Sequence, residues 1–334
     1  MRKSLTLILA IFVYLVSTPS SKAQSTFTVA SWSSTDPNVL GLTDGVEATL
    51  YDISLNSIRT FDIPAAAYSD EILQQINRWS PDLRYVARVT LYNGDVRTYP
   101  GYRYSGSTHL SVWDVEMGRL LFEVSPLDFT PPIVWSQHSD RLAISTFSTQ
   151  TGMNIDLYDL TGKLIFEFPP SNTGLWDRFA WNSTGRLFAY NADEDILIYD
   201  FDTNQYLVSP TPDFIFDFDL KFSASNPDLL AYSSSNPQGI VIWNVRTARI
   251  EGIAGGEYLR FDWQSDRLVT IGYDEQIRVW DTSSFQELAS YDRGYISYLQ
   301  LSPFSDVMLT NGTDTNTYQI IDPLTGNILA TQQR

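Results

Sequence analysis

Three carboxylates in apolar, strand-like segments are the residues of this sequence that could perform acid–base chemistry. Asp217 and Asp219 stand two apart in "FDFDL" and so share one face of a β-strand, and Asp262 stands in the similar segment "RFDW". Two carboxyl groups within reach of one substrate could transfer protons to it, or could bind a cation or a sugar. The alternative, which we favour, is that these acids are ordinary polar residues in contact with water.

Other catalytic signatures do not occur in the sequence. It contains no HExxH, GxSxG, Walker or strand-linked GxGxxG motif, and with no cysteine it has no thiol nucleophile. The two histidines, His109 and His138, cannot supply a three-histidine metal site, and we expect each to be a surface or packing residue. We therefore predict no catalytic residue, no metal site and no cofactor, and we favour a binding protein over an enzyme.

Two short motifs recur along the chain and indicate which elements carry these residues. The first ends a strand with an aromatic residue, once an isoleucine, followed by Asp or Asn, and its anchors are Tyr51, Trp113, Tyr158, Tyr199, Trp243, Trp280 and Ile321. The second precedes a polar turn upstream of each, and its anchors are Trp32, Trp79, Trp135, Trp181, Phe222, Trp263 and Leu301. The spacing predicts seven copies of a unit of about 44 residues.

Each unit contains four strand-like segments. Nearly continuous apolar runs such as "ILIY" and "GIVIW" are typical of strands that are buried on both faces, as in blades packed around an axis. Only residues 69–79 suggest as much as a turn or two of helix. We predict an all-β fold, a seven-bladed β-propeller of four-stranded antiparallel blades, in which the aromatic anchor is buried between blades and the following Asp orders a turn.

The paired motifs resemble those of WD-repeat β-propellers over residues 27–334. The resemblance is most specific in "YDEQIRVWD", where Asp274 stands six residues before Trp280, and Asp193 has the same place before Tyr199. A TolB-like propeller, usually six-bladed and exported, is the second possibility because it uses a similar "WSPD…LA" signal. The Gly-His dipeptide of WD repeats is missing, which implies that their buried hydrogen-bond network is absent and that several blades are held by packing alone.

The resemblance also bears on how the ring closes. WD-repeat propellers usually complete the last blade with a strand from the N-terminus. Here residues 27–32 are expected to form the innermost strand of blade 1, and residues 326–333 the outermost strand of blade 7. We therefore predict closure by face packing between two complete blades.

The family's arrangement places the long loops of successive blades on one face of the disc. The insertion "YNGDVRTYPGYRYSGSTH" in blade 2 and the segment "PPSNTGLWDR" that enters blade 4 are rich in Tyr, Trp and Arg, the residues of binding hot spots. We predict a binding patch around Arg103, Tyr104, Trp176 and Arg178 for a protein, or for a small-molecule or glycan ligand. The alternative is a long hairpin that packs on its neighbours.

The N-terminus has the layout of a secretory signal peptide. Arg2 and Lys3 precede an apolar run from Leu5 to Val16, and small residues stand at the cleavage positions before a cut after Ala23. The run is shorter than the roughly 20 residues of a spanning helix, so we predict a cleaved signal in residues 1–23 and a single propeller domain in residues 24–334, without a stable membrane span. An uncleaved anchor is the alternative.

The composition limits which cellular compartments and which classes of partner are expected. The absence of cysteine in an exported chain favours a bacterial export route, to a secreted, periplasmic or cell-surface location. The formal net charge of −17 opposes binding to nucleic acid. We predict an exported WD-repeat-like propeller that is a non-catalytic, protein- or ligand-binding scaffold. The alternatives are a carbohydrate-active enzyme with carboxylates at the central channel, and a sensor ectodomain held by an uncleaved anchor.

Overall fold

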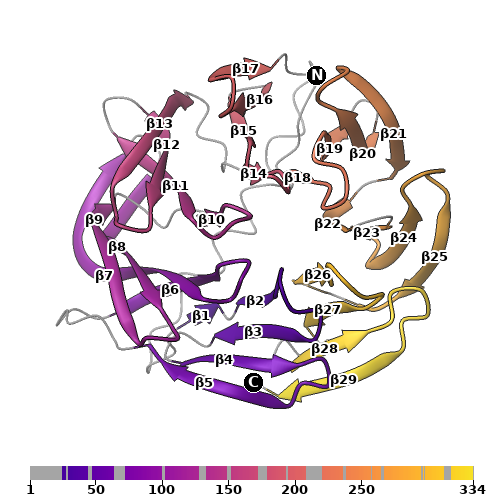
Figure 1. Ribbon diagram of the computed structural model, residues 1–334, viewed down its shortest axis with the longest axis horizontal. Coiled ribbons are helices and arrows are strands. Elements are labelled where there is room, and N and C mark those ends of the chain that lie inside the picture. Colours follow the sequence, from indigo (N-terminus) through magenta and orange to yellow (C-terminus); the bar gives the residue numbers. More distant parts are fainter. Residues whose placement is uncertain are drawn as a thin grey trace.

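Seven β-sheets form a ring in the computed structural model (Figure 1). The structure describes residues 25–27, 29–43, 47–63, 72–99, 102–127, 133–148, 152–171, 179–192, 195–207, 220–235, 238–256, 258–264, 267–294, 296, 298–311 and 317–333. All regular elements of these residues are strands, and each sheet runs from an inner strand near the axis to an outer strand at the rim. This confirms the predicted seven-bladed β-propeller.

Apart from β1, the strands of the first four blades follow one another along the chain. Blade 1 contains β2 (Val29–Trp32), β3 (Val39–Thr43), β4 (Glu47–Asp52) and β5 (Ser57–Asp62). Blade 2 contains β1 (Ser25–Phe27), β6 (Ile72–Trp79), β7 (Tyr85–Tyr99), β8 (Tyr102–Asp114) and β9 (Arg119–Leu127). Blade 3 contains β10 (Ile133–Trp135), β11 (Arg141–Ser148), β12 (Gly152–Asp159) and β13 (Leu164–Ser171). Blade 4 contains β14 (Phe179–Trp181), β15 (Leu187–Ala192), β16 (Asp195–Asp200) and β17 (Gln205–Leu207).

The last three blades have the same order. Blade 5 contains β18 (Leu220–Phe222), β19 (Leu229–Ser235), β20 (Gln238–Asn244) and β21 (Arg249–Gly255). Blade 6 contains β22 (Tyr258–Gln264), β23 (Arg267–Gly272), β24 (Gln276–Asp281) and β25 (Glu287–Asp292). Blade 7 contains β26 (Leu299–Leu301), β27 (Met308–Asn311), β28 (Thr317–Ile321) and β29 (Ile328–Gln333).

The antiparallel strand order gives the disc two different faces. Turns between the first and second strands of a blade, and between its third and fourth strands, lie at one end of the sheet, and we call this side the turn face. Connections between the second and third strands, and those that enter the next blade, lie on the other side, which we call the loop face. The two recurring sequence motifs therefore both end on the turn face.

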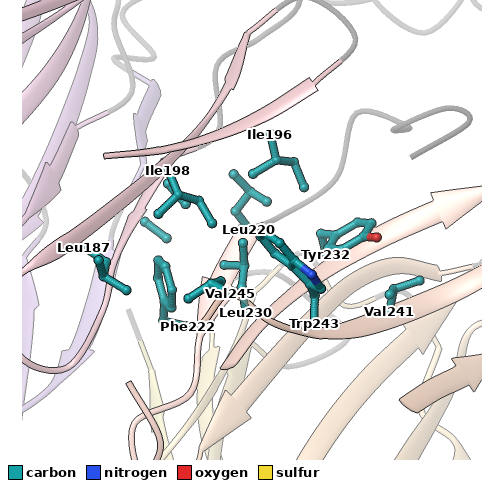
Figure 2. Packing of buried hydrophobic residues seen from close by; sticks show 12 residues of the cluster. Leu187, Ile196, Ile198, Leu220, Phe222, Leu230, Tyr232, Val241, Trp243 and Val245 are labelled. Atoms are coloured by element: carbon teal, nitrogen blue, oxygen red, sulfur yellow. The ribbon is translucent and has the colours of Figure 1, made fainter. Parts of the chain in front are cut away.

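The hydrophobic core is divided among the contacts between neighbouring blades, and Figure 2 shows the contact between blades 4 and 5. In β20, Val241 and Trp243 pack toward blade 4, while Ile240 and Ile242 pack toward blade 6. This double burial explains the continuous apolar run "GIVIW", since no residue in the middle of the strand faces water. Each buried aliphatic side chain of this size contributes about 1.5–3 kcal/mol.

The Asp or Asn after each aromatic anchor orders the turn that follows it, as predicted. In blade 1, Oδ1 of Asp52 accepts hydrogen bonds from the backbone N–H groups of Ser54 and Asn56, each at 2.9 Å. Equivalent bonds from the residues of the next turn are accepted by Asp114, Asp159, Asp200, Asn244, Asp281 and Asp322. The repeated motif is thus a repeated side-chain-capped turn.

The ring closes between two complete blades, which confirms the predicted closure. β2 is the inner strand of blade 1, and β29 is the outer strand of blade 7, and none of the strands that the structure describes is shared between these two blades. Leu40 and Leu42 of blade 1 pack against Leu309 and Ile320 of blade 7 in one hydrophobic cluster. Face packing therefore joins the two ends of the repeat array.

Two details of the N-terminal region differ from the sequence-based prediction. Phe27 does not belong to the inner strand of blade 1: it ends β1, which pairs in parallel with β6 of blade 2. The suggested helical turn within residues 69–79 is also wrong from Ile72 onward, because this segment forms β6. Pairing with strands on both of its edges outweighs the weak helical pattern, and Gln75, Asn77 and Trp79 are buried on one face of the strand.

Blade 6 contains two hydrogen bonds from buried aromatic side chains, which do not contradict the expectation that several blades are held by packing alone. The indole N–H of Trp280 donates to Oγ1 of the fully buried Thr270 at 3.0 Å. The hydroxyl of Tyr258 donates to the carbonyl of Gly255, and burial raises the pKa of this phenol to about 12. Packing alone does not hold this blade, because Thr270 gives the indole a partner inside the sheet.

Candidate functional site

The carboxylate of Asp262 is a structural link among three blades. Asp262 stands on β22 and is 1% exposed. Its Oδ1 forms an ion pair with Nζ of Lys221 on β18, and its Oδ2 accepts the backbone N–H of Leu301 on β26 at 2.6 Å. It also accepts the N–H of Trp263 at 2.8 Å. This carboxylate is fully engaged in holding blades 5, 6 and 7 together. Asp217 and Asp219 lie outside the described residues.

The predicted binding patch is described only in part. The insertion of blade 2 is a long hairpin formed by β7 and β8, which places Arg103 and Tyr104 in β8 opposite Thr98 and Arg97. The side chains of Arg103 and Tyr104 are outside the described part of the structure, as are Trp176 and Arg178 entirely. The patch therefore stays a prediction, with its blade 2 half located on a hairpin at the loop face.

Both histidines are packing or surface residues, as predicted. His138 is exposed, and its Nε2 lies 2.9 Å from the carbonyl oxygen of Thr184 in the next blade. The ring of His109 meets the buried ring of Tyr92 edge-on, with centroids 5.3 Å apart. Within the described residues, no three His, Cys, Asp or Glu side chains are grouped so that they could hold a metal ion.

A hollow of about 680 Å³ opens on the turn face between blades 4 and 5, and we call it the blade 4–5 hollow. Its apolar part includes Leu187, Leu207 and Val245. Leu187 and Val245 are buried members of the hydrophobic cluster between these blades, and Leu207 packs against it. The hollow is thus an opening over the blade–blade core.

Arginine–aspartate pairs form the walls of the hollow. Arg186 donates to both oxygens of the buried Asp200, at 2.8 and 2.5 Å. This contact lowers the pKa of Asp200 to about 2 and raises the pKa of Arg186. On the opposite wall, Arg246 donates to Asp228 at 2.7 and 3.1 Å. The guanidinium of Arg141, from blade 3, lies 5.0 Å from the centroid of the Trp181 ring.

Sequence reasoning missed this hollow, although the repeat carries its signal. Arg186 directly precedes the second strand of blade 4, and Asp200 ends its third strand, so both lie at the turn face. Arg84 and Asp114 have the same positions in blade 2 and also form an ion pair, at 3.2 Å. Aligning charges along with the aromatic anchors would have predicted these pairs.

A smaller hollow of about 500 Å³ lies on the loop face of blade 6. It is lined by Tyr258, the exposed Tyr273, Asp274 and Arg278, together with two glycines. Arg278 donates to both oxygens of Asp274, which lowers the pKa of this carboxyl group to about 2. Asp274, noted in the sequence for its distance from Trp280, therefore anchors an arginine beside the tight turn.

Comparisons with known proteins show the fold. No protein-family model and no curated protein matches the chain. A chain in the crystal structure of a mitotic checkpoint complex matches with a TM-score of 0.62 and 17% identity, over 86% of this chain and 87% of that chain. The crystal structure of the computationally designed Ika8 protein matches with a TM-score of 0.57 and 16% identity, over 88% and 84%. At these identities the likeness establishes a β-propeller and nothing about function.

No helix in the described part of the chain has the length and hydrophobicity that crossing a membrane requires.

Proposed function

We propose that this protein is an exported, WD-repeat-like propeller that works as a non-catalytic scaffold and binds a partner protein on its loop face. Seven blades, rather than the six usual in TolB-like propellers, support the WD-repeat assignment. So do the seven capped turns and the pairing of Trp280 with Thr270 in blade 6. Propeller proteins commonly present such a face to their partners, and this part of the argument rests on fold analogy.

The hairpin of blade 2 is the observation that carries the proposal. Among the described residues, the pairing of β6 with β7 reaches Tyr92, and the pairing of β9 with β8 reaches Thr108. Beyond them, β7 and β8 continue as a two-stranded ribbon, with the pairs Val96↔Ser105, Arg97↔Tyr104, Thr98↔Arg103 and Tyr99↔Tyr102. A two-stranded ribbon is marginally stable in water, and its Tyr- and Arg-rich sequence suits a contact surface.

The proposed location follows from the sequence of the N-terminus. Residues 1–23 resemble a cleaved signal peptide, so the mature chain would start at Gln24, directly before β1. Export would place the propeller in a secreted, periplasmic or cell-surface compartment. N-terminal sequencing of the protein from its source cell tests this part: a start at Met1 would contradict it.

Affinity capture with a matched control tests the binding proposal. Residues 24–334 would be immobilised and exposed to envelope and secreted material of the source cell, and the bound proteins identified. The double variant Arg103→Ala, Trp176→Ala should lose the partner. The control variant Arg119→Ala, Arg249→Ala removes exposed arginines on the outer strands β9 and β21 and should keep it. Equal capture by all three proteins would contradict the proposed face.

A further inference from the structure

The smaller hollow on the loop face of blade 6 combines an exposed aromatic ring with an ion pair, and we call it the blade 6 hollow. It is lined by Gly255, Gly256, Tyr258, Tyr273, Asp274 and Arg278. Blades 7 and 1 separate it from blade 2 on the shorter way around the ring (Figure 1). The hollow therefore lies apart from the hairpin that carries the proposed partner surface.

Glycines leave bare backbone around this hollow. A Cβ atom on Gly255 would have no heavy atom within 4 Å, so this position faces open space. A Cβ atom on Gly256 would lie 2.5 Å from the hydroxyl oxygen of Tyr258, and one on Gly272 would overlap the carboxylate of Asp274. The volume of about 500 Å³ lies in the range of sites for small ligands.

Tyr273 gives the hollow an apolar surface that a ligand can reach. It directly follows β23 and is 57% exposed, whereas Tyr258 is buried. A ligand that lies flat on the Tyr273 ring would remove apolar surface of both partners from water. The ring therefore favours a ligand with a flat, weakly polar face.

The ion pair of Asp274 and Arg278 keeps some hydrogen-bonding capacity. Arg278 donates to both carboxylate oxygens of Asp274, whose side chain is 50% exposed. Oδ1 also accepts the N–H of Gln276 at 3.2 Å, whereas Oδ2 accepts from Arg278 alone within the described part of the chain. A carboxylate oxygen can accept more than one hydrogen bond, and a guanidinium has further N–H donors. An acceptor and a donor thus remain next to each other.

The charges here disfavour a charged ligand. Asp274 neutralises Arg278, and a carboxylate oxygen of Glu287 lies 3.8 Å from Nε of the same arginine. An anion would meet both carboxylates in a chain whose formal net charge is −17, and a cation would have to compete with the arginine for Asp274. Two neighbouring hydroxyls avoid both costs, because one can donate to Oδ2 while the other accepts from the guanidinium.

We propose that the blade 6 hollow binds an uncharged pyranose ring of a glycan. A pyranose with equatorial hydroxyls has a face of C–H groups, which covers the ring of Tyr273, and an edge of neighbouring hydroxyls, which bond to Asp274 and Arg278. This site is separate from the blade 2 hairpin and does not depend on the function proposed there.

Saturation-transfer NMR on the intact chain tests the proposal, with methyl β-D-glucopyranoside as the probe. Sorbitol is the first reference, because it has neighbouring hydroxyls but no ring face. Hydroxymethyl tetrahydropyran is the second, because it has the ring but lacks the neighbouring hydroxyls. The chain should bind the probe saturably and should bind each reference about tenfold more weakly, since each loses one of the two contacts.

Variants of Tyr273 then locate the stacking contact. Tyr273→Ala should weaken the probe by about tenfold, whereas Tyr273→Phe keeps the ring and should bind like the unmodified chain. Phe304→Ala is the matched control: it removes another aromatic side chain, 51% exposed in the turn before β27, and should leave binding unchanged. Thermal unfolding of the variants checks that they fold.

Arg278→Lys tests the hydrogen bonds. It keeps a positive charge beside Asp274 but loses the planar set of donors, so the probe should lose most of its advantage over hydroxymethyl tetrahydropyran. The proposal would be overturned by no saturable binding of the probe, by equal binding of the probe and sorbitol, or by equal weakening in Tyr273→Ala and Phe304→Ala. An unchanged advantage in Arg278→Lys would also overturn it. Partner capture by the blade 2 hairpin is a separate result that these outcomes do not affect.

Discussion

The indole N–H of Trp32 in blade 1 donates to the backbone carbonyl of Gln300 in blade 7 at a distance of 3.2 Å. This hydrogen bond joins the inner strands of the first and last blades, where no strand is shared. Trp32→Phe removes the bond and part of the buried ring. We expect it to lower the free energy of unfolding by about 1 kcal/mol more than a tryptophan replacement without a lost hydrogen bond, measured by urea denaturation.

Trp79→Phe is the matched control for this experiment. Trp79 has the same position in blade 2 and is 4% exposed, but its indole N–H has no hydrogen-bond partner among the described residues. Equal losses of stability for the two variants would mean that the bond to Gln300 contributes nothing to closure.

Asp262→Asn should destabilise the ring strongly, because the variant leaves Lys221 without its charged partner and weakens the acceptor of Leu301 N–H. We expect a loss of about 3 kcal/mol in the free energy of unfolding. Asp306→Asn is the comparison: Asp306 pairs with Arg267, as Asp262 pairs with Lys221, but the Asp306 side chain is 76% exposed, so the loss should stay below about 1 kcal/mol. Similar losses would show that Asp262 is not a link between blades. A double-mutant cycle with Lys221→Met would measure the coupling between Lys221, which is 32% exposed, and the buried Asp262.

Part of the loss in the free energy of unfolding at low pH should come from protonation of Asp200. Hydrogen bonds from Arg186 lower its pKa from the ordinary value of 3.8 to about 2. The folded state therefore binds this proton more weakly than the unfolded state does, and the stabilisation is complete above about pH 5 and lost as the pH falls from about 4 to 2. Asp200→Asn should be less stable than the unmodified chain at pH 7, and the difference should shrink across that window. Ile198→Val, a change without charge at a fully buried site, should keep a constant difference. A constant difference for Asp200→Asn would contradict the link.

Gly41→Ala should disturb the contact between blades 1 and 2. A Cβ atom at this position would lie 2.7 Å from the Trp79 indole, which is below van der Waals contact. Because Trp79 is buried and cannot move freely, we expect a loss of about 1–3 kcal/mol in the free energy of unfolding. In the Trp79→Phe background the smaller ring leaves room, so the same alanine should cost less. An equal cost in both backgrounds would exclude the contact as the cause.

The repeat itself could be predicted from the sequence because the same short motif forms a strand end and a turn in every blade. An aromatic residue such as Trp280 and the following Asp281 determine both burial and turn geometry within a few residues, so their pattern indicates strands, turns and the number of blades. The position of β1 could not be predicted in this way. Ser25–Phe27 has no turn motif, and it pairs with a strand almost fifty positions further along, at Gln74–Ile76.

The candidate site was less predictable because its chemistry depends on contacts between blades. Nothing near Asp262 in the sequence indicates that its carboxylate would receive Lys221 from one neighbouring blade and Leu301 from the other. Likewise Arg246 and Leu207 are almost forty positions apart and line the same hollow only because blades 4 and 5 pack face to face. Such pairs follow from the curvature of the ring, which the repeat pattern does not specify.

Closure by packing makes the joint between blades 1 and 7 mechanically different from the others. Every other pair of neighbouring blades is also joined by the polypeptide itself, whereas this joint is held by the side chains around Leu40 and Leu309 and by the contacts of Trp32 and Tyr298 across the boundary. Because no connection between blades spans this joint, blades 1 and 7 can separate without stretching the chain between any two blades. Blades 1 and 7 could separate while all seven sheets kept their internal hydrogen bonds, so the ring would open at this joint before any blade lost its strands.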